Sequence, residues 1–243
     1  MPTAIRSRRL WRWVVATLLV VVVAAAWTMG VLGHYRAQLL ALPATIEMLD
    51  ADQGVGYVRL ADVSPTLVNA LVATEDQSFW YNPGIDPEGI IRAAWTDIRT
   101  GSLAQGGSTI SQELVRDRLL NLDKTVTRKL KEVVLALALN RYYDKRAILT
   151  MYLNQVYLGH GAYGVVAAAR VYFGTTPALL TPAQATLLAG LPQAPSYYDP
   201  LTNLAAARQR QREVLSAMVN QHYITATQAS AIFAQPLGLL PPT

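Results

Sequence analysis

The stretch S-P-T-L-V-N-A-L-V-A-T-E-D-Q-S-F, residues 64–79, decides the fold class. Its opening Ser-Pro pair is a typical helix start, because Ser caps free N–H groups and Pro fits the first helical position. Val68, Leu71 and Val72 then recur at helical spacing on one stripe. Strand patterns are scarce along the rest of the chain, so the sequence predicts a mainly α protein.

Further helices are predicted beyond this first one. They are expected near 85–99, 109–120, 125–143, 145–157, 161–171, 182–190, 203–221 and 225–233. Residues 34–63 instead indicate a connector with some extended structure, in which Gly54–Leu60 could form a short strand.

Residues 14–33 form an uncharged apolar run of 20 residues, the length that crosses a bilayer as a helix. Four arginines precede this run and only Arg36 follows it closely. The bias predicts a cytoplasmic N-terminus and a body on the other side of the membrane. A cleaved signal peptide normally has a shorter apolar core, so we favour an uncleaved anchor.

The amino-acid composition of the chain limits the classes of function that it can have. Hydrophobic residues make up 52% and charged residues 15%, which indicates membrane contact. Of the net charge of +5, four charges come from the N-terminal arginines; from residue 13 onward 17 basic residues face 16 acidic ones. A general nucleic-acid surface is therefore excluded. The chain has no cysteine, so it forms no disulfide and is compatible with an oxidising compartment.

Two acidic residues stand where the first helix should end. Glu75 lies on the same stripe as Leu71 and Val72, so its carboxylate would be partly desolvated and suited to general acid–base chemistry. Alternatively, the helix has ended and Glu75 is a solvated terminal charge, which spacing alone favours. Asp76 lies about 100° around the helix, so the two carboxylates should not face one substrate atom.

The stretch Q-G-G-S-T-I-S-Q-E-L, residues 105–114, places two glycines before a helix start. Thr109 and Gln112 fit a capping box, and Arg116 follows two turns along. A loop that feeds a helix N-terminus offers free N–H groups to a phosphate. An ordinary loop-to-helix junction is the commoner explanation.

In T-R-K-L-K-E, residues 127–132, Arg128 and Lys129 precede Glu132 by four and three positions and can share its face. The apolar run 133–139 then predicts a buried helix. Such a cluster suits a phosphorylated substrate, although a salt bridge on a solvated first turn is commoner.

In residues 152–164 the glycines mark a tight turn, and His160 has no evident catalytic partner.

Together these segments resemble the peptidoglycan glycosyltransferase family, membrane-anchored enzymes that polymerise the bacterial cell-wall glycan from lipid II. E-D-Q-S-F is similar to the family's first motif, G-G-S-T-I-S-Q to its second and R-K-L-K-E to its third. Residues 148–165 are similar to the fourth motif and residues 207–218 to the fifth. Each motif is weak singly, but five in order, across roughly residues 45–231, are highly specific.

The resemblance implies an all-α, lysozyme-like fold, with a globular head and a smaller apolar lobe that dips into the membrane. The implied segments are a cytoplasmic N-terminus (1–13), a transmembrane helix (14–33), a connector (34–63), a glycosyltransferase domain (64–235) and a tail (236–243). The expected protein is either monofunctional or the transglycosylase part of a bifunctional class A penicillin-binding protein.

The resemblance also implies catalytic roles. Glu75 would be the base that deprotonates the acceptor's 4-hydroxyl, which attacks the anomeric carbon of the lipid-linked chain and releases undecaprenyl pyrophosphate. Glu132, with Arg128 and Lys129, would stabilise that pyrophosphate. A divalent cation, Mg or Mn, could bind at Glu132, and no tightly bound cofactor is implied.

Other residues would bind substrate or shape the cleft. These are Asp76, Phe79, Ser108, Thr109, Gln112 and Arg116, together with the aromatic residues Trp80 and Tyr81. The implied partners are lipid II, the lipid-linked glycan chain, the membrane and, as candidates, penicillin-binding transpeptidases. The implied location is the cell (inner) membrane, crossed once, with the catalytic domain extracytoplasmic.

The chain departs from the family pattern at four positions. Asn82 stands where His is usual, Glu113 where Gln is usual, Arg116 where Lys is usual and Asp117 where Asn is usual. The two added acids should weaken anion binding unless a metal or Arg116 offsets them. Asn82, Glu113 and Asp117 are the only support for an inactive glycan-binding scaffold. A lysozyme-like hydrolase is a further alternative, but it has no pyrophosphate for the R-K-x-x-E cluster to hold.

Overall fold

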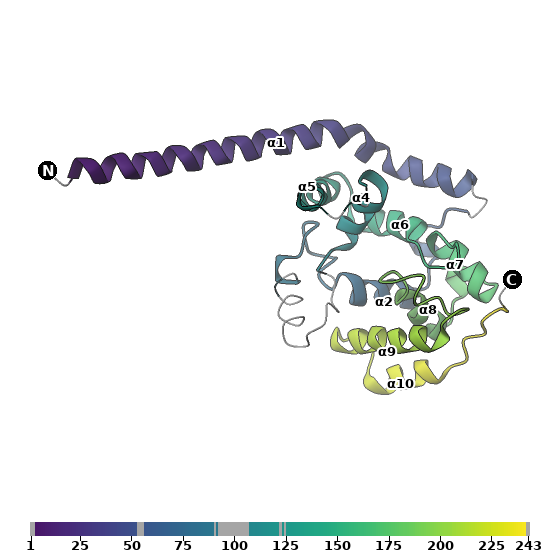
Figure 1. The fold of residues 1–243 in the computed structure, drawn as a ribbon. Coiled ribbons are helices and arrows are strands. Elements are labelled where there is room, and N and C mark those ends of the chain that lie inside the picture. The colour runs from purple at the N-terminus through teal and green to yellow at the C-terminus, as the bar shows by residue number, and fades with distance from the viewer. Residues whose placement is uncertain are drawn as a thin grey trace.

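The computed structural model describes residues 3–52, 56–89, 91, 107–121, 123 and 125–241. A long helix, α1 (Thr3–Asp52), passes over a body of shorter helices (Figure 1). Within these residues the only β pairing is an isolated bridge between Tyr157 and Tyr163. The predicted mainly α class is therefore confirmed, while the division into a head and a smaller lobe stays a prediction.

The helices of the body begin and end close to the predicted positions. They are α2 (Pro65–Glu75), α4 (Ile110–Leu119), α5 (Val126–Tyr142), α6 (Lys145–Gln155), α7 (Gly164–Phe173), α8 (Pro182–Ala189), α9 (Leu204–Asn220) and α10 (Ala226–Ala234). Two short 3-10 helices, η1 (Leu60–Asp62) and η2 (Pro177–Leu179), lie in the connections. Most of the helix predicted near 85–99 falls outside the described residues.

Side-chain caps explain why these helices start where they do. The hydroxyl of Thr109 accepts the Gln112 N–H, and the Gln112 side chain accepts the Thr109 N–H, so the predicted capping box is confirmed. Ser64 occupies the N-cap of α2, but its side chain makes no capping hydrogen bond. Pro at the first helical position, rather than the Ser64 hydroxyl, marks this start.

The connector predicted at 34–63 is wrong over residues 34–52, which continue α1. Leu39, Leu42 and Ile46 recur at helical spacing and are buried against the body, so this part of α1 belongs to the core. Pro43 lies inside the helix and has no N–H for the Leu39 carbonyl. The Tyr143 hydroxyl donates to that carbonyl at 3.1 Å and replaces the missing donor.

The strand predicted at 54–60 is not formed in its described part. Residues 56–59 have no regular secondary structure and Leu60 begins η1, whereas Gly54 and Val55 lie outside the described residues. The Val58 N–H and carbonyl instead pair with the side-chain amide of Asn154, each at 2.8 Å. A side chain on α6 therefore takes the place of a neighbouring strand.

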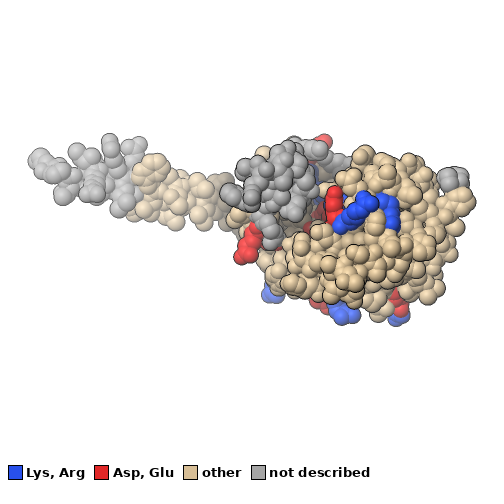
Figure 2. All heavy atoms as spheres, turned by 90° about the horizontal axis from the view of Figure 1, so that it is seen from below, with Lys and Arg blue, Asp and Glu red and all other residues tan. Residues whose placement is uncertain are grey.

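One described helix is long and apolar enough to cross a membrane, over Trp13–Leu49. Its N-terminal half projects away from the body (Figure 1, Figure 2) and exposes apolar side chains such as Leu19 and Val22. The predicted span 14–33 lies within this apolar stretch. The face of the body in Figure 2 carries only small, separate groups of Lys and Arg, consistent with a nearly neutral body.

Helix α2 lies in the middle of the body (Figure 1). It packs against α8 and α9, while α4 packs against α5 and α6. Its buried residues Leu67, Ala70 and Leu71 belong to the main core. The C-terminal end of α2 therefore lies where these two groups of helices meet, and the acidic pair Glu75 and Asp76 stands at that end.

Candidate active site

Glu75 is the last residue of α2, and its side chain is only 12% exposed. Its Oε1 atom lies 3.8 Å from Nη2 of Arg210 on α9 and accepts no hydrogen bond from the described residues. Burial raises the pKa of Glu75, Arg210 and Arg116 oppose that rise, and Asp76 adds to it. The predicted desolvated carboxylate is confirmed, and the solvated-charge alternative is wrong.

Asp76 is 4% exposed, and both of its oxygens accept hydrogen bonds. Oδ1 accepts from Asn82 Nδ2 at 2.8 Å and Ser78 Oγ at 3.3 Å, while Oδ2 accepts from the Ile110 N–H at 3.1 Å. Burial raises the pKa of Asp76 to about 6 despite these bonds. Asp76 joins the end of α2 to the start of α4 and so supports the site, while its contact with a substrate stays a prediction.

Three residues expected to bind substrate lie in the interior instead. Phe79 is a fully buried core residue, with the Lys145 ammonium 4.8 Å from its ring centroid. Thr109 and Gln112 are equally buried because they build the cap of α4, and the Thr109 hydroxyl also donates to the Gly84 carbonyl at 2.6 Å. These residues fix the backbone around the site, and their assignment as substrate-binding residues stays a prediction.

Trp80 and Tyr81, next to the buried Phe79, have exposed side chains. Their exposure leaves them available to a glycan or a lipid. The prediction that they shape the cleft or meet lipid stays open.

The predicted cation cluster forms in the first turn of α5. Glu132 is 1% exposed; its Oε2 accepts from Arg128 Nη1 at 3.0 Å, and its Oε1 accepts from Lys129 Nζ. Lys129 also donates to Ser108 Oγ at 2.8 Å. The predicted ion pair is therefore present, but its carboxylate is buried. Glu132 holds two cations in place, and the half-exposed Lys129 can meet an anionic group.

A divalent cation does not fit at Glu132. Both of its oxygens are engaged by Arg128 and Lys129. The described part of the chain has no group of three or more His, Cys, Asp or Glu side chains that could hold an ion. Mg and Mn require several oxygen ligands, which this cluster does not offer.

Glu113, one of the departures from the family pattern, lies in the site on α4. Its side chain is 19% exposed, and Oε2 accepts from the Tyr152 hydroxyl at 3.0 Å. Burial, and next the charge of Glu75, raise the pKa of Glu113 to about 8. Arg116 Nη1 is 4.0 Å from Glu113, while its Nε donates to Asp117 Oδ1 at 2.7 Å.

Arg210 is a site residue whose role the sequence did not assign. It lies within the fifth motif, where Arg208 and Arg212 stand at alternating positions with it. The structure turns Arg210 inward: its Nη1 donates to Glu213 at 2.7 Å and its Nε donates to the Gly190 carbonyl at 3.3 Å. Spacing could not single out Arg210, because only the packing of α9 against α8 and α2 selects it.

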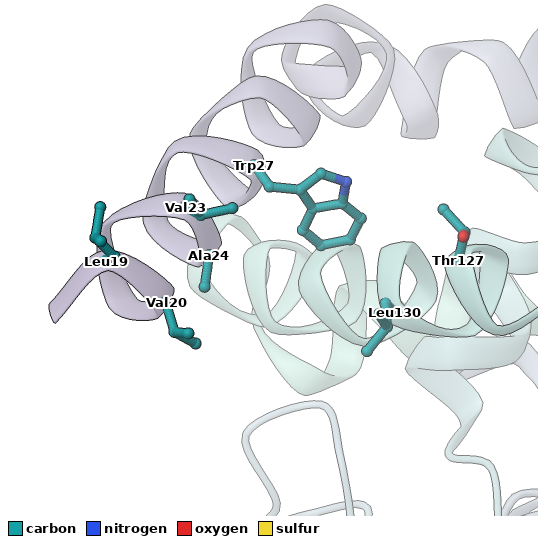
Figure 3. Close-up of a pocket in the computed structure, with 7 residues that line it drawn as sticks. All are labelled: Leu19, Val20, Val23, Ala24, Trp27, Thr127 and Leu130. Atoms are coloured by element: carbon teal, nitrogen blue, oxygen red, sulfur yellow. The ribbon is translucent and has the colours of Figure 1, made fainter. Parts of the chain in front are cut away.

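An apolar groove of about 540 Å³ lies between α1 and the first turn of α5 (Figure 3). Seven residues line it: Leu19, Val20, Val23, Ala24, Trp27, Thr127 and Leu130. Thr127 and Leu130 are three residues apart and share one face of α5, whereas Arg128 and Lys129 point with Glu132 to a different face, so the groove and the cation cluster are separate. Its lining comes mostly from the part of α1 that is apolar enough to cross a membrane.

Comparisons with known proteins agree with these observations. A family model described as Transglycosylase matches residues 43–219. Penicillin-binding protein 1A of Aquifex aeolicus is 46% identical over 181 residues, covering 74% of this chain and 25% of that protein. Penicillin-binding protein 2D of Bacillus subtilis is 42% identical over 185 residues, covering 76% of this chain and 27% of that protein.

A crystal structure of penicillin-binding protein 1A from Haemophilus influenzae matches with a TM-score of 0.45 at 26% identity, covering 76% of this chain and 18% of that chain. The chain thus spans about a quarter of the length of the curated relatives it matches. It belongs to the transglycosylase family, which is the peptidoglycan glycosyltransferase family that its five motifs resemble.

Proposed function

We propose that the protein polymerises lipid II into β-1,4-linked glycan strands by inverting glycosyl transfer. The observation that carries the proposal is Glu75: a largely buried carboxylate with an unbonded oxygen, facing Arg210. Such a group is poised to accept a proton, because burial makes it a stronger base and no other donor occupies it.

The proposed step moves one proton and exchanges one bond. Glu75 takes the proton from the 4-hydroxyl of the acceptor sugar as that oxygen attacks the anomeric carbon of the lipid-linked chain. The bond from the anomeric carbon to the pyrophosphate oxygen breaks, and its electron pair leaves with undecaprenyl pyrophosphate. Lys129 and Arg128, held by Glu132, would stabilise the charge that develops on that leaving group.

The groove in Figure 3 supports a lipid-linked substrate. Its lining comes mostly from the apolar part of α1, so a polyprenyl chain that enters it would lie along the helix that can cross a membrane. The same helix would anchor the protein in the cell membrane, crossing it once, with its arginine-rich end in the cytoplasm and the body outside. Penicillin-binding transpeptidases remain candidate partners.

A direct test is incubation of the purified protein with labelled lipid II, followed by separation of the products by length. The expected product is long glycan, identified by its sensitivity to cleavage by an added muramidase. Shortened preformed glycan would favour the hydrolase, and binding without turnover would favour the inactive scaffold. Because Glu132 does not fit a divalent ion, we expect polymerisation to continue in excess EDTA; a complete loss that Mg or Mn restores would contradict this expectation.

A further inference from the structure

Glu113 and Glu75 form a pair of largely buried carboxyl groups on α4 and α2. Neither carboxyl has a close cation of its own: Arg116 lies 4.0 Å from Glu113, and Arg210 lies 3.8 Å from Glu75. Two nearby carboxylates removed from water do not both ionise readily, because each disfavours the charge on the other. The pair should therefore retain one proton.

The surrounding charges support a retained proton. Both arginines make their shorter contacts elsewhere, Arg116 with Asp117 at 2.7 Å and Arg210 with Glu213 at 2.7 Å. Four carboxyl groups therefore share two guanidinium groups. On α5, Glu132 also acts on Arg116 but is itself paired within its own cluster. The described groups that act directly on the pair are Asp76, Arg116, Asp117, Tyr152 and Arg210.

The two carboxyl groups differ in how strongly these neighbours favour their charge. Two cations, Arg210 and Arg116, favour an ionised Glu75, and Asp76 opposes them. Glu113 has one cation, Arg116, and the Tyr152 hydroxyl in favour of its charge, while Glu75 and Asp117 disfavour it. We propose that Glu113 is the positioning residue that holds the proton of this pair and so keeps Glu75 ionised, with Tyr152 fixing its orientation. This assignment rests on the proposed function of Glu75 as the base.

A protonated Glu113 is neutral and has nearly the shape of Gln, the residue usual at this position of the motif. Loss of the proton would place a second negative charge beside Glu75, in a site that must admit a pyrophosphate. The KM for lipid II should therefore rise as Glu113 ionises, and kcat/KM should fall on the alkaline side.

The kinetic test compares kcat/KM for lipid II from about pH 7 to about pH 9, using the full membrane-anchored chain. We expect a fall of about tenfold in the wild type, as for one ionisation near pH 8, and a fall of less than about threefold in Glu113→Gln. The control Glu47→Gln removes an exposed carboxylate on α1, away from the pair, and it should keep the tenfold fall. An unaltered fall in Glu113→Gln would overturn the proposal.

A second measurement needs no turnover. NMR of the full chain with 13C-labelled glutamate carboxyl groups should show one Glu carboxyl that titrates near pH 8 in the wild type and in Glu47→Gln, but not in Glu113→Gln. If every Glu carboxyl in the wild type is ionised at about pH 7, the pair of Glu75 and Glu113 retains no proton and the proposal is wrong. A titration near pH 8 in a protein that makes no polymer would overturn the proposed function alone.

Discussion

Asn82 connects the turn after α2 to other parts of the body through its amide group. Its Nδ2 donates to Asp76 at 2.8 Å, and its Oδ1 accepts from the Gly84 N–H at 2.9 Å and from Lys145 Nζ at 3.1 Å. The sequence marks Asn82 only as a departure from the family's usual His. The structure shows that this departure is compatible with a fully hydrogen-bonded amide that orders Asp76.

Replacing Asn82 with Ala should therefore destabilise the protein. The change removes the shortest hydrogen bond to the buried Asp76 and the acceptor of the half-buried Lys145, which costs roughly 1–3 kcal/mol of unfolding free energy. Urea unfolding followed by circular dichroism measures the loss. Asn220→Ala, at the exposed end of α9, is the control and should change stability by less than about 0.5 kcal/mol. Equal losses in both variants would contradict the role given to Asn82.

At the scale of elements, Gly84 allows the turn after α2 to approach α4 and α5 at once. Its φ is +111°, and an added Cβ would lie 2.5 Å from both the Ala136 carbonyl oxygen and Asn140 Nδ2 on α5. Its own carbonyl accepts from Thr109 on α4. Neither a left-handed backbone nor a contact this close is open to another residue without a shift.

We expect Gly84→Ala to cost several kcal/mol and to lower the yield of folded protein, because strain and steric clash add. Gly56→Ala is a matched control: its φ is +87°, but an added Cβ meets nothing within 4 Å. That variant should lose only about 1 kcal/mol, the cost of the backbone conformation alone. Thermal unfolding measures both changes, and equal effects would show that the clash at Gly84 is relieved.

Local signals in the sequence predicted the helices well. The Thr109 cap, the Pro at the start of α2 and the apolar stripe that carries Glu75 all depend on neighbours within one or two turns. The sequence predicts a connector over residues 34–52, but α1 continues through Pro43. It can do so because Tyr143, a hundred residues away in the sequence, donates to the carbonyl that Pro43 leaves without a donor. A partner at that separation leaves no periodic trace in the sequence.

The site was predicted only in part for the same reason. Burial of Glu75 and the pairing within the first turn of α5 follow from short spacings. The inward turn of Arg210 depends on α9 packing against α2 and α8, while Arg208 and Arg212 stack on Phe233 of α10. The fifth motif contains three arginines, and only tertiary packing determines which of them faces Glu75.

At the scale of the whole molecule, buried carboxyl groups make stability depend on pH. The pKa of Asp76 is raised from 3.8 to about 6, and that of Glu113 from 4.5 to about 8. A carboxyl with a raised folded pKa stabilises the fold below its unfolded pKa, and this contribution is lost as pH rises through the folded pKa. These two groups should therefore lower stability progressively between about pH 4 and about pH 8.

We expect the Tm to fall by several degrees between about pH 5 and about pH 8.5, and to fall less in Glu113→Gln, which has no proton to lose there. Differential scanning fluorimetry in matched buffers checks both. A Tm that rises over this range, or an equal fall in the variant, would contradict the assigned burial of Glu113.

The topology of the chain is also testable at this scale. A reporter that is active only outside the cytoplasm should work when fused after Pro241 and fail when fused before the arginine-rich segment. A reporter that works only when fused before the arginine-rich segment would place the site in the cytoplasm, on the wrong side of the membrane for building a cell wall.

The most direct measurement of the account is the single-turnover rate of lipid II coupling by Glu75→Gln, beside the wild type and Glu47→Gln, whose side chain is exposed on α1. Gln keeps the size of Glu75 but accepts no proton at neutral pH. We expect a rate at least ~10²-fold below the wild type for Glu75→Gln, the usual contribution of a general base, and a rate near the wild type for Glu47→Gln. Equal rates for Glu75→Gln and the wild type would contradict it.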